Sequence, residues 1–157
     1  MGSSLEVVPA TEAHARALAP RMRPRDVEEV RDAGALAPLD ALLLSLGRST
    51  YARALLLDGL VVAIWGVAPF GQIAGGIWLL GSPELDRHPK LFLSIGRGEV
   101  ARMSDMYLVL TNYVSAANTA SIRWLKRLGF TVAKPRPWGY ARRPFCHFFM
   151  LRRSHVR

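Results

Sequence analysis

Residue types that most often do covalent or metal chemistry are sparse in this sequence of 157 residues. The single cysteine, Cys146, excludes an intrachain disulfide and a zinc site built from several thiolates. It stands between Phe145 and His147 in an aromatic run, which favours a small buried side chain over a nucleophile. The histidines at positions 14, 88, 147 and 155 show no paired metal-ligand spacing, so we expect no metal site.

Basic residues are the second group that could act on a ligand, and they are unevenly placed. All 12 acidic residues precede position 106, whereas 10 of the 21 basic residues follow it. A field of this sign attracts anions: nucleic acid, phosphate-bearing cofactors or an acidic protein surface. A solvated basic face of a soluble protein would carry the same charge, so both interpretations stay open.

Arginines alternate with aromatic residues in one part of this basic region. Single-strand nucleic-acid binders combine the same residue types, because bases stack on aromatic rings while cations neutralise the backbone. An ordinary basic loop is the simpler interpretation. The residues concerned are Arg136, Trp138, Tyr140, Arg142 and Arg143.

The elements that must position these residues follow from apolar periodicity and from turn and cap signals. Asp58-Gly59 is a hairpin signal, Ala68-Pro69-Phe70-Gly71 reads as a second turn, and 135–144 reads as a loop. The predicted strands are Leu5–Val8, Thr50–Leu57, Leu60–Val67, Ile73–Leu80, Leu108–Val114, Phe130–Ala133 and Phe145–Leu151. The predicted helices begin after Thr11 and span Pro24–Arg31, Pro38–Leu46 (closed by Gly47), Pro89–Met106 and Thr119–Leu128.

This order of elements predicts one α/β domain over residues 1–157, with a mixed, mostly antiparallel central sheet flanked by helices. The longest apolar run, near residues 55–70, is broken by Asp58, Gly59, Gly66 and Pro69, so we expect no membrane span. The start Met1-Gly2-Ser3-Ser4 lacks a basic stretch followed by an apolar one, so we expect no secretory signal.

Residues 107–130, YLVLTNYVSAANTASIRWLKRLGF, form the most informative segment. A strand leads to Asn118, an amphipathic helix follows, and Gly129-Phe130 opens the next strand. Asn caps the helix, Gly takes the left-handed turn, and Phe anchors the strand. The segment resembles the GCN5-related N-acetyltransferase (GNAT) family, in which a helix begins at an Asn and ends in Gly-Phe eleven and twelve residues later.

The GNAT resemblance implies a fold, a cofactor and a cofactor contact. In the family two parallel strands splay beside this Asn and acyl-CoA enters the gap, so acetyl-CoA is the implied cofactor and Asn118 its contact. A glycine-rich loop holds the CoA pyrophosphate in the family. The matching stretch, residues 81–89, lacks the glycine pattern and carries Glu84 and Asp86. We expect Arg87, with His88 and Lys90, to compensate in part.

Catalytic groups are also implied by the resemblance rather than by spacing. The family often uses a Glu on the fourth strand as general base. Ile73–Leu80 contains no acid, but Glu84 lies just beyond it and could act through water, or could simply be a solvated acid. The family's usual acid for the leaving thiolate is a Tyr where Leu125 stands here. Tyr113 is a substitute, as is Tyr107, although core packing would explain both.

Short segments also give a narrower resemblance, to an acetyltransferase-like family among the head and internal virion genes of short-tailed bacteriophages. This resemblance implies a structural or assembly role in the virion, with portal, tail or internal proteins as partners and location in the host cytoplasm or the particle. An active acetyl-CoA-dependent N-acetyltransferase remains the alternative. The segments are Arg23–Glu29, Gly66–Pro69, Gly76–Gly81, Asn112–Val114 and Ser121–Phe130.

Overall fold

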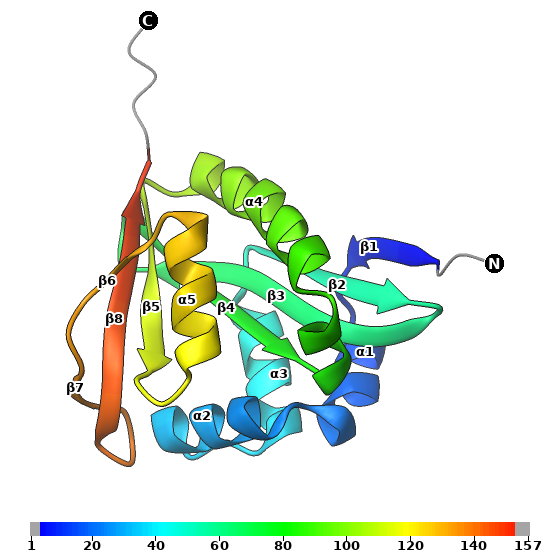
Figure 1. Ribbon diagram of the computed structural model, residues 1–157, viewed down its shortest axis with the longest axis horizontal. Coiled ribbons are helices and arrows are strands. Elements are labelled where there is room, and N and C mark those ends of the chain that lie inside the picture. Colours follow the sequence, from blue (N-terminus) through cyan, green and yellow to red (C-terminus); the bar gives the residue numbers. More distant parts are fainter. Residues whose placement is uncertain (1–3, 153–157) are drawn as a thin grey trace, which may run out of the picture.

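A mixed β-sheet forms the centre of the computed structural model, which describes residues 4–152 (Figure 1). Within that range the strand order is β1-β2-β3-β4-β5-β8-β6, and β7 pairs with β8 at the edge. Among these strands only β4 and β5 run parallel. The strands are β1 (Leu5–Pro9), β2 (Tyr51–Leu57), β3 (Leu60–Phe70), β4 (Ala74–Gly81), β5 (Val109–Ser115), β6 (Thr131–Val132), β7 (Arg136–Trp138) and β8 (Arg143–Leu151).

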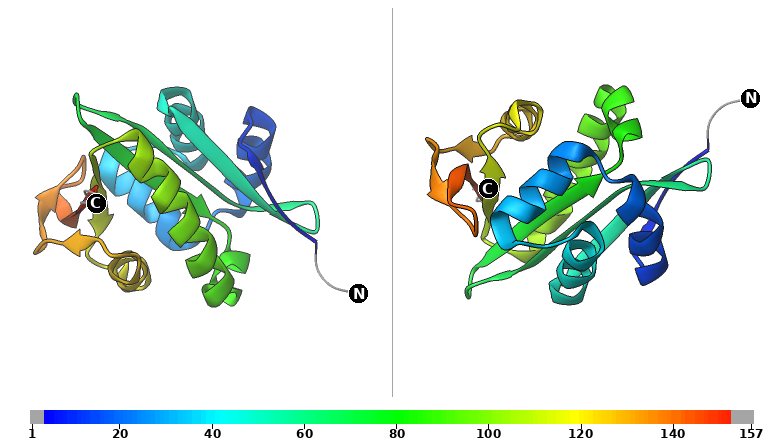
Figure 2. Two further views of the ribbon diagram at one scale, coloured as in Figure 1. Left: turned by 90° about the horizontal axis from the view of Figure 1, so that it is seen from above. Right: turned by 90° about the horizontal axis from the view of Figure 1, so that it is seen from below.

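Helices cover both faces of the sheet, so the predicted α/β class is confirmed. Viewed from above and below, α4 and α5 lie on one face, and α1 and α3 lie on the other (Figure 2). The helices are α1 (Glu12–Leu18), α2 (Pro24–Gly34), α3 (Pro38–Arg48), α4 (Pro89–Met106) and α5 (Thr119–Leu128). Two short 3₁₀ turns, η1 (Ala19–Arg21) and η2 (Pro83–Arg87), connect them to the rest.

The hydrophobic core divides along the same two faces. Under α4 and α5, the buried Val100, Met103 and Leu125 pack with Val114 and Phe148 of the sheet. Under α1 and α3, the buried Leu18, Leu42, Ala54, Ile64 and Leu80 form a second cluster. Each face therefore holds its helices by apolar burial, which supplies about 25 cal/mol per Å² of apolar surface removed from water.

Three of the caps that the sequence predicts, at Thr11, Asn118 and Gly129, are present. The Thr11 hydroxyl accepts a hydrogen bond from the His14 N–H at the start of α1. The Asn118 side chain does the same for the Ser121 N–H at the start of α5. Gly129 ends α5 with φ 101°, a left-handed conformation that favours glycine.

Several boundaries differ from the prediction by one to three residues, and three of the differences are instructive. Gly47 lies inside α3 rather than closing it. The helix continues to Arg48, and at its end the Ser49 N–H donates a hydrogen bond to the Leu46 carbonyl. Residues 68–70 of the predicted turn belong to β3, where Pro69 pairs with Gly75, and the turn itself lies at 71–73. Proline is tolerated there because β2 begins only at Tyr51, opposite Val67, so no residue of β2 lies opposite Pro69 to accept a hydrogen bond from the missing N–H. The predicted loop 135–144 contains β7, which forms a short hairpin with β8.

Two sequence expectations concern residues outside the described range: the secretory-signal reading of residues 1–3, and His155. Within residues 4–152, none of the helices combines the length and the apolar character needed to cross a membrane.

Candidate functional site

The parallel strands β4 and β5 separate soon after they meet. They pair only where Ala74–Gly76 lies beside Val109–Thr111. Just beyond, the Asn112 side-chain amide donates a 2.6 Å hydrogen bond to the Ile77 carbonyl, which bridges the widening gap. The structure thus contains the splayed parallel pair that the resemblance of the segment around Asn118 implies.

The backbone of β4 offers hydrogen-bonding groups to this gap. Gly81 directs both its N–H and its carbonyl away from β3, toward Asp26 and Arg23. Backbone groups alternate sides along an antiparallel pair, so Leu79 directs its N–H and carbonyl the same way as Ile77 and Gly81. Since β5 pairs no further than Gly76, these Leu79 groups face the open part of the gap.

A cavity of about 410 Å³ occupies the gap and reaches both faces of the sheet. Its wall includes Ile77 and Leu79 of β4 and Asn112 and Tyr113 of β5. Side chains from α2 and α3 line it on one face, and side chains from α4 and α5 line it on the other. A ligand in this cavity would therefore pass between the two strands, from one helical layer to the other.

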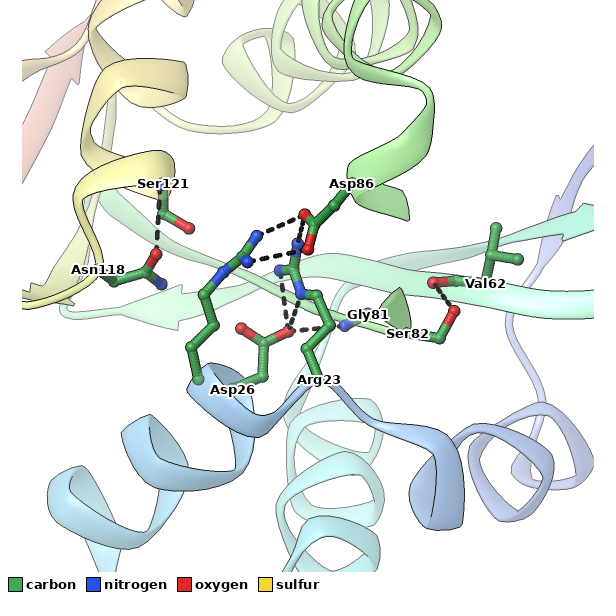
Figure 3. A network of polar contacts seen from close by, with 9 residues as sticks. Arg23, Asp26, Val62, Gly81, Ser82, Asp86, Asn118 and Ser121 are labelled. Atoms are coloured by element: carbon green, nitrogen blue, oxygen red, sulfur yellow. Dashed lines mark hydrogen bonds and ion pairs between the residues drawn. The ribbon is translucent and has the colours of Figure 1, made fainter. Parts of the chain in front are cut away.

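Helix α2 bridges the open end of the gap through two carboxylates one turn apart. Asp26 accepts a 2.9 Å hydrogen bond from the Gly81 N–H at the end of β4. Glu29 accepts one from the Ser115 N–H at the end of β5. Figure 3 shows Asp26 reaching Gly81 from α2, with Arg23 beside it. Arg23 is almost fully buried and pairs with Asp26, so the β4 end of this bridge is charge-compensated.

Glu29 lies in the cavity wall, and its carboxyl group has a pKa near neutral pH. Burial raises its pKa from 4.5 to about 7, although the Ser115 N–H favours the charged form. Nearby Asp26 raises the pKa further, and the Asn118 amide and Arg23 lower it. A carboxyl group poised near neutral pH can exchange a proton with a bound amine.

Sequence reasoning missed Glu29 as a site residue. It includes Glu29 only in the segment Arg23–Glu29, which carries the narrower resemblance. The Glu29 contact joins residues 86 positions apart in the chain, and no local pattern marks it. Two acids at i and i+3 after a proline are the only signal in the sequence.

Asn118 caps α5 and has a further donor to offer. Its side-chain oxygen accepts from the Ser121 N–H at 3.2 Å, as Figure 3 shows. Its Nδ2 is buried and makes no hydrogen bond of normal length within residues 4–152, although it lies close enough to Glu29 to lower the pKa of that carboxyl. A buried donor without an acceptor is costly, but Asn118 does not line the cavity.

Tyr113 lines the same cavity from β5. Its ring stacks on Trp138 of β7, with centroids 4.1 Å apart and planes within 9°. Tyr107, the other tyrosine considered from sequence, lies elsewhere and shares a 2.7 Å hydrogen bond with the Thr50 hydroxyl. Tyr113 therefore remains the predicted acid, and packing against Trp138 accounts for its position equally well.

Glu84 and Arg87, the other residues predicted from sequence, both lie in η2 at the end of β4. Glu84 forms a 3.1 Å ion pair with Arg21, and a hydrogen bond from Ser82 helps to hold the pKa of Glu84 below its ordinary value. It does not line the cavity. Arg87 is exposed and forms no ion pair within residues 4–152. The roles suggested for both stay predictions.

In the described part of the chain, no three His, Cys, Asp or Glu side chains converge. Cys146 is buried on β8, and burial raises the pKa of its thiol. A protonated, buried thiol is a poor nucleophile.

The fold recurs in solved structures of low sequence identity. A putative acetyltransferase from Acinetobacter baylyi superposes with a TM-score of 0.70 at 14% identity, covering 100% of this chain and 99% of that one. An N-acetyltransferase from Staphylococcus aureus gives 0.70 at 12%, covering 96% and 99%. A putative acetyltransferase from Salmonella typhimurium, with its cofactor acetyl-CoA, gives 0.66 at 16%, covering 98% and 96%.

Sequence comparison adds no closer relative. No protein-family model matches this chain, and no curated protein sequence matches it. A GNAT-family acetyltransferase from Streptococcus pneumoniae is similar only at the level of structure, with a TM-score of 0.66 at 15% identity over 94% of this chain and 99% of that one.

Proposed function

We propose that this chain, which has the fold of the GNAT acetyltransferases, transfers an acyl group from acyl-CoA to an amine, with Glu29 as the general base. The observation that carries the proposal is the cavity between β4 and β5. It joins the two helical layers and has Glu29 in its wall. Function has to be argued from such a site, because one fold serves many activities.

The residues around the gap suit the pantetheine arm of CoA, which is an extended chain with two amide groups. The unpaired Leu79 N–H and carbonyl could bond these amides as another strand would. The buried Asn118 Nδ2, which lacks an acceptor, could donate to a carbonyl or phosphate oxygen. These two features of the structure fit acetyl-CoA, the cofactor implied by the sequence resemblance.

Glu29 would act on the amine. An amine is protonated at neutral pH and has to lose a proton before it can attack a carbonyl carbon. The Glu29 carboxylate, with a pKa of about 7, is deprotonated in a large fraction of molecules at that pH, yet basic enough to accept the proton. Acetyl-CoA, when bound, supplies the thioester. Tyr113, in the same cavity, is the residue predicted to return a proton to the thiolate that leaves.

The test is acetyl transfer from acetyl-CoA to a panel of primary amines, namely amino acids, spermidine and short peptides, followed by mass spectrometry. Glu29→Gln should lower kcat/KM about 10²- to 10⁴-fold, the usual contribution of a general base. Glu28→Gln is the matched control, because Glu28 is the exposed neighbour on the same helix. Equal rates for the wild type and Glu29→Gln would contradict the role of Glu29, and no transfer to any amine would contradict the activity.

A structural or assembly role in a bacteriophage particle is the second candidate. It is suggested by the narrower resemblance, and one observation favours it: residues 106–152 contain no acidic side chain, which suits an acidic portal or tail protein, or DNA. Mass spectrometry of purified particles and assembly intermediates tests this role, since the absence of the protein from both would rule it out.

A further inference from the structure

A second groove, of about 540 Å³, lies between α4 and α5 and adjoins the cavity. It shares Arg23, Leu79, Phe92, Ser121 and Trp124 with the cavity, so the two spaces are contiguous. We name it the arginine groove, after the four arginines in its wall. These are Arg23 and Arg25 near the start of α2 and Arg123 and Arg127 on α5.

Two donors in the wall of the arginine groove lack acceptors. Arg25 Nε and Trp124 Nε1 are both buried and have no hydrogen-bond partner within residues 4–152. Both are donors, and leaving a donor buried and unpaired costs free energy. A ligand rich in oxygen acceptors would satisfy them.

Asp86 is the one acidic residue that lines the arginine groove within the described chain. It comes from η2 and binds two guanidinium groups at once. Arg25 donates to both of its oxygens, at 2.6 and 2.9 Å, and Arg23 donates at 3.0 Å. Figure 3 shows Asp86 above Arg23 and Asp26. Two guanidinium groups around one anion are also how arginine binds phosphate.

The loop after β4 is poorly suited to bind phosphate through its backbone. Pro83 and Pro89 have no N–H, and the N–H groups of Leu85 and His88 are used inside the turn. Side-chain donors could replace the glycine-rich loop of the family. The arginine groove lies beside this loop and supplies them.

We infer that the arginine groove binds the phosphates of an acyl-CoA ligand through Arg25, Arg123 and Arg127, and that Asp86 occupies this anion site until phosphate displaces it. The inference rests on the proposed function, since it assigns the phosphate end of the same ligand. In this arrangement the Asp86 carboxylate competes with the ligand phosphates for the arginines.

Binding measured by calorimetry tests the inference without any turnover. The probes are CoA, 3′,5′-ADP, which carries phosphates of CoA without the thiol arm, and pantetheine, which carries the arm without phosphate. Arg25→Gln and the double variant Arg123→Gln/Arg127→Gln should each weaken 3′,5′-ADP binding tenfold or more and leave pantetheine binding unchanged. Asp86→Asn should tighten 3′,5′-ADP binding several-fold, because the competing charge is gone.

Arg16→Gln is the matched control, because Arg16 forms an exposed pair with Glu12 on α1 and does not line the arginine groove. A purely structural Asp86 would give the opposite result, with Asp86→Asn weakening binding along with stability. The inference is overturned if 3′,5′-ADP does not bind, or if the arginine variants bind it as the wild type does. Acetyl transfer by those same variants at wild-type rates would leave the proposed function standing while this assignment fails.

Discussion

Glu29 is a single residue whose chemistry depends on its surroundings. Desolvation raises the pKa of its carboxyl from 4.5 to about 7, so the native state binds a proton more tightly than the unfolded chain does. Between these two pH values the native state holds more protons, and the free energy of unfolding therefore falls as the pH rises. Above pH 7 both states are deprotonated and this contribution is constant.

We expect the free energy of unfolding to fall by about 1–3 kcal/mol between pH 5 and pH 8 because of Glu29, since each pKa unit is worth about 1.4 kcal/mol. Urea unfolding at the two pH values measures it. Glu29→Gln should remove most of the decrease, because its side chain does not ionise, whereas Glu28→Gln should keep it. A decrease of the same size in Glu29→Gln would show that another group causes it.

Helix α4 contains two glycines, Gly96 and Gly98, whose surroundings differ. A methyl group on Gly96 would lie 2.8 Å from the Trp124 ring and 3.3 Å from Leu128, both on α5. That ring is held by its stack on Phe92, with centroids 4.8 Å apart, and cannot easily move. A methyl group on Gly98 would meet nothing within 4 Å. Gly96 therefore allows α4 and α5 to approach, and Gly98 does not serve packing.

Gly98→Ala should raise the free energy of unfolding by about 0.5–1 kcal/mol, because alanine restricts the unfolded chain and favours helix. Gly96→Ala should lower it by about 1–3 kcal/mol, because the added methyl overfills a packed contact. Thermal and urea unfolding of the two variants, two residues apart on one helix, compares them directly. Equal effects of the two substitutions would mean that the α4–α5 contact does not limit the packing.

At the scale of the whole molecule, the gap is where the two parts of the sheet meet. Strands β1–β4 and strands β5–β8 are joined by one short parallel pairing, by the carboxylate bridge from α2 and by the packing of α4 on α5. A ligand that fills the cavity would contact both parts at once. It would bind the native state and not the unfolded chain.

Acetyl-CoA at 100 times its Kd should therefore stabilise the native state by about 2.7 kcal/mol and raise the Tm by roughly 5–10 °C. A thermal-shift titration measures the change, and hydrogen exchange should show slower exchange at the Leu79 and Ser115 amides. No shift at saturating concentration would argue against the cavity as an acyl-CoA site.

Sequence alone determined the class of fold and its most diagnostic segment. The α5 cap at Asn118, the left-handed Gly129 and the buried Phe130 follow from local rules, because caps and turns depend on residues close in the chain. The α4 boundaries, Pro89–Met106, were predicted for the same reason. The end of β3 did not follow from local rules: Pro69 reads as a turn residue, and it is acceptable in β3 only because β2 begins no earlier than Tyr51.

Tertiary structure decided the chemistry of the site. Glu29 meets Ser115 across 86 positions, and Asp86 meets Arg25 across 61. The acidity of Glu29 and the pairing of Asp86 depend on burial and on neighbours that only the folded chain brings near. Long-range contacts of this kind leave no periodic pattern in a sequence. The fold could therefore be inferred from local signals, whereas the groups proposed to act could be identified only in three dimensions.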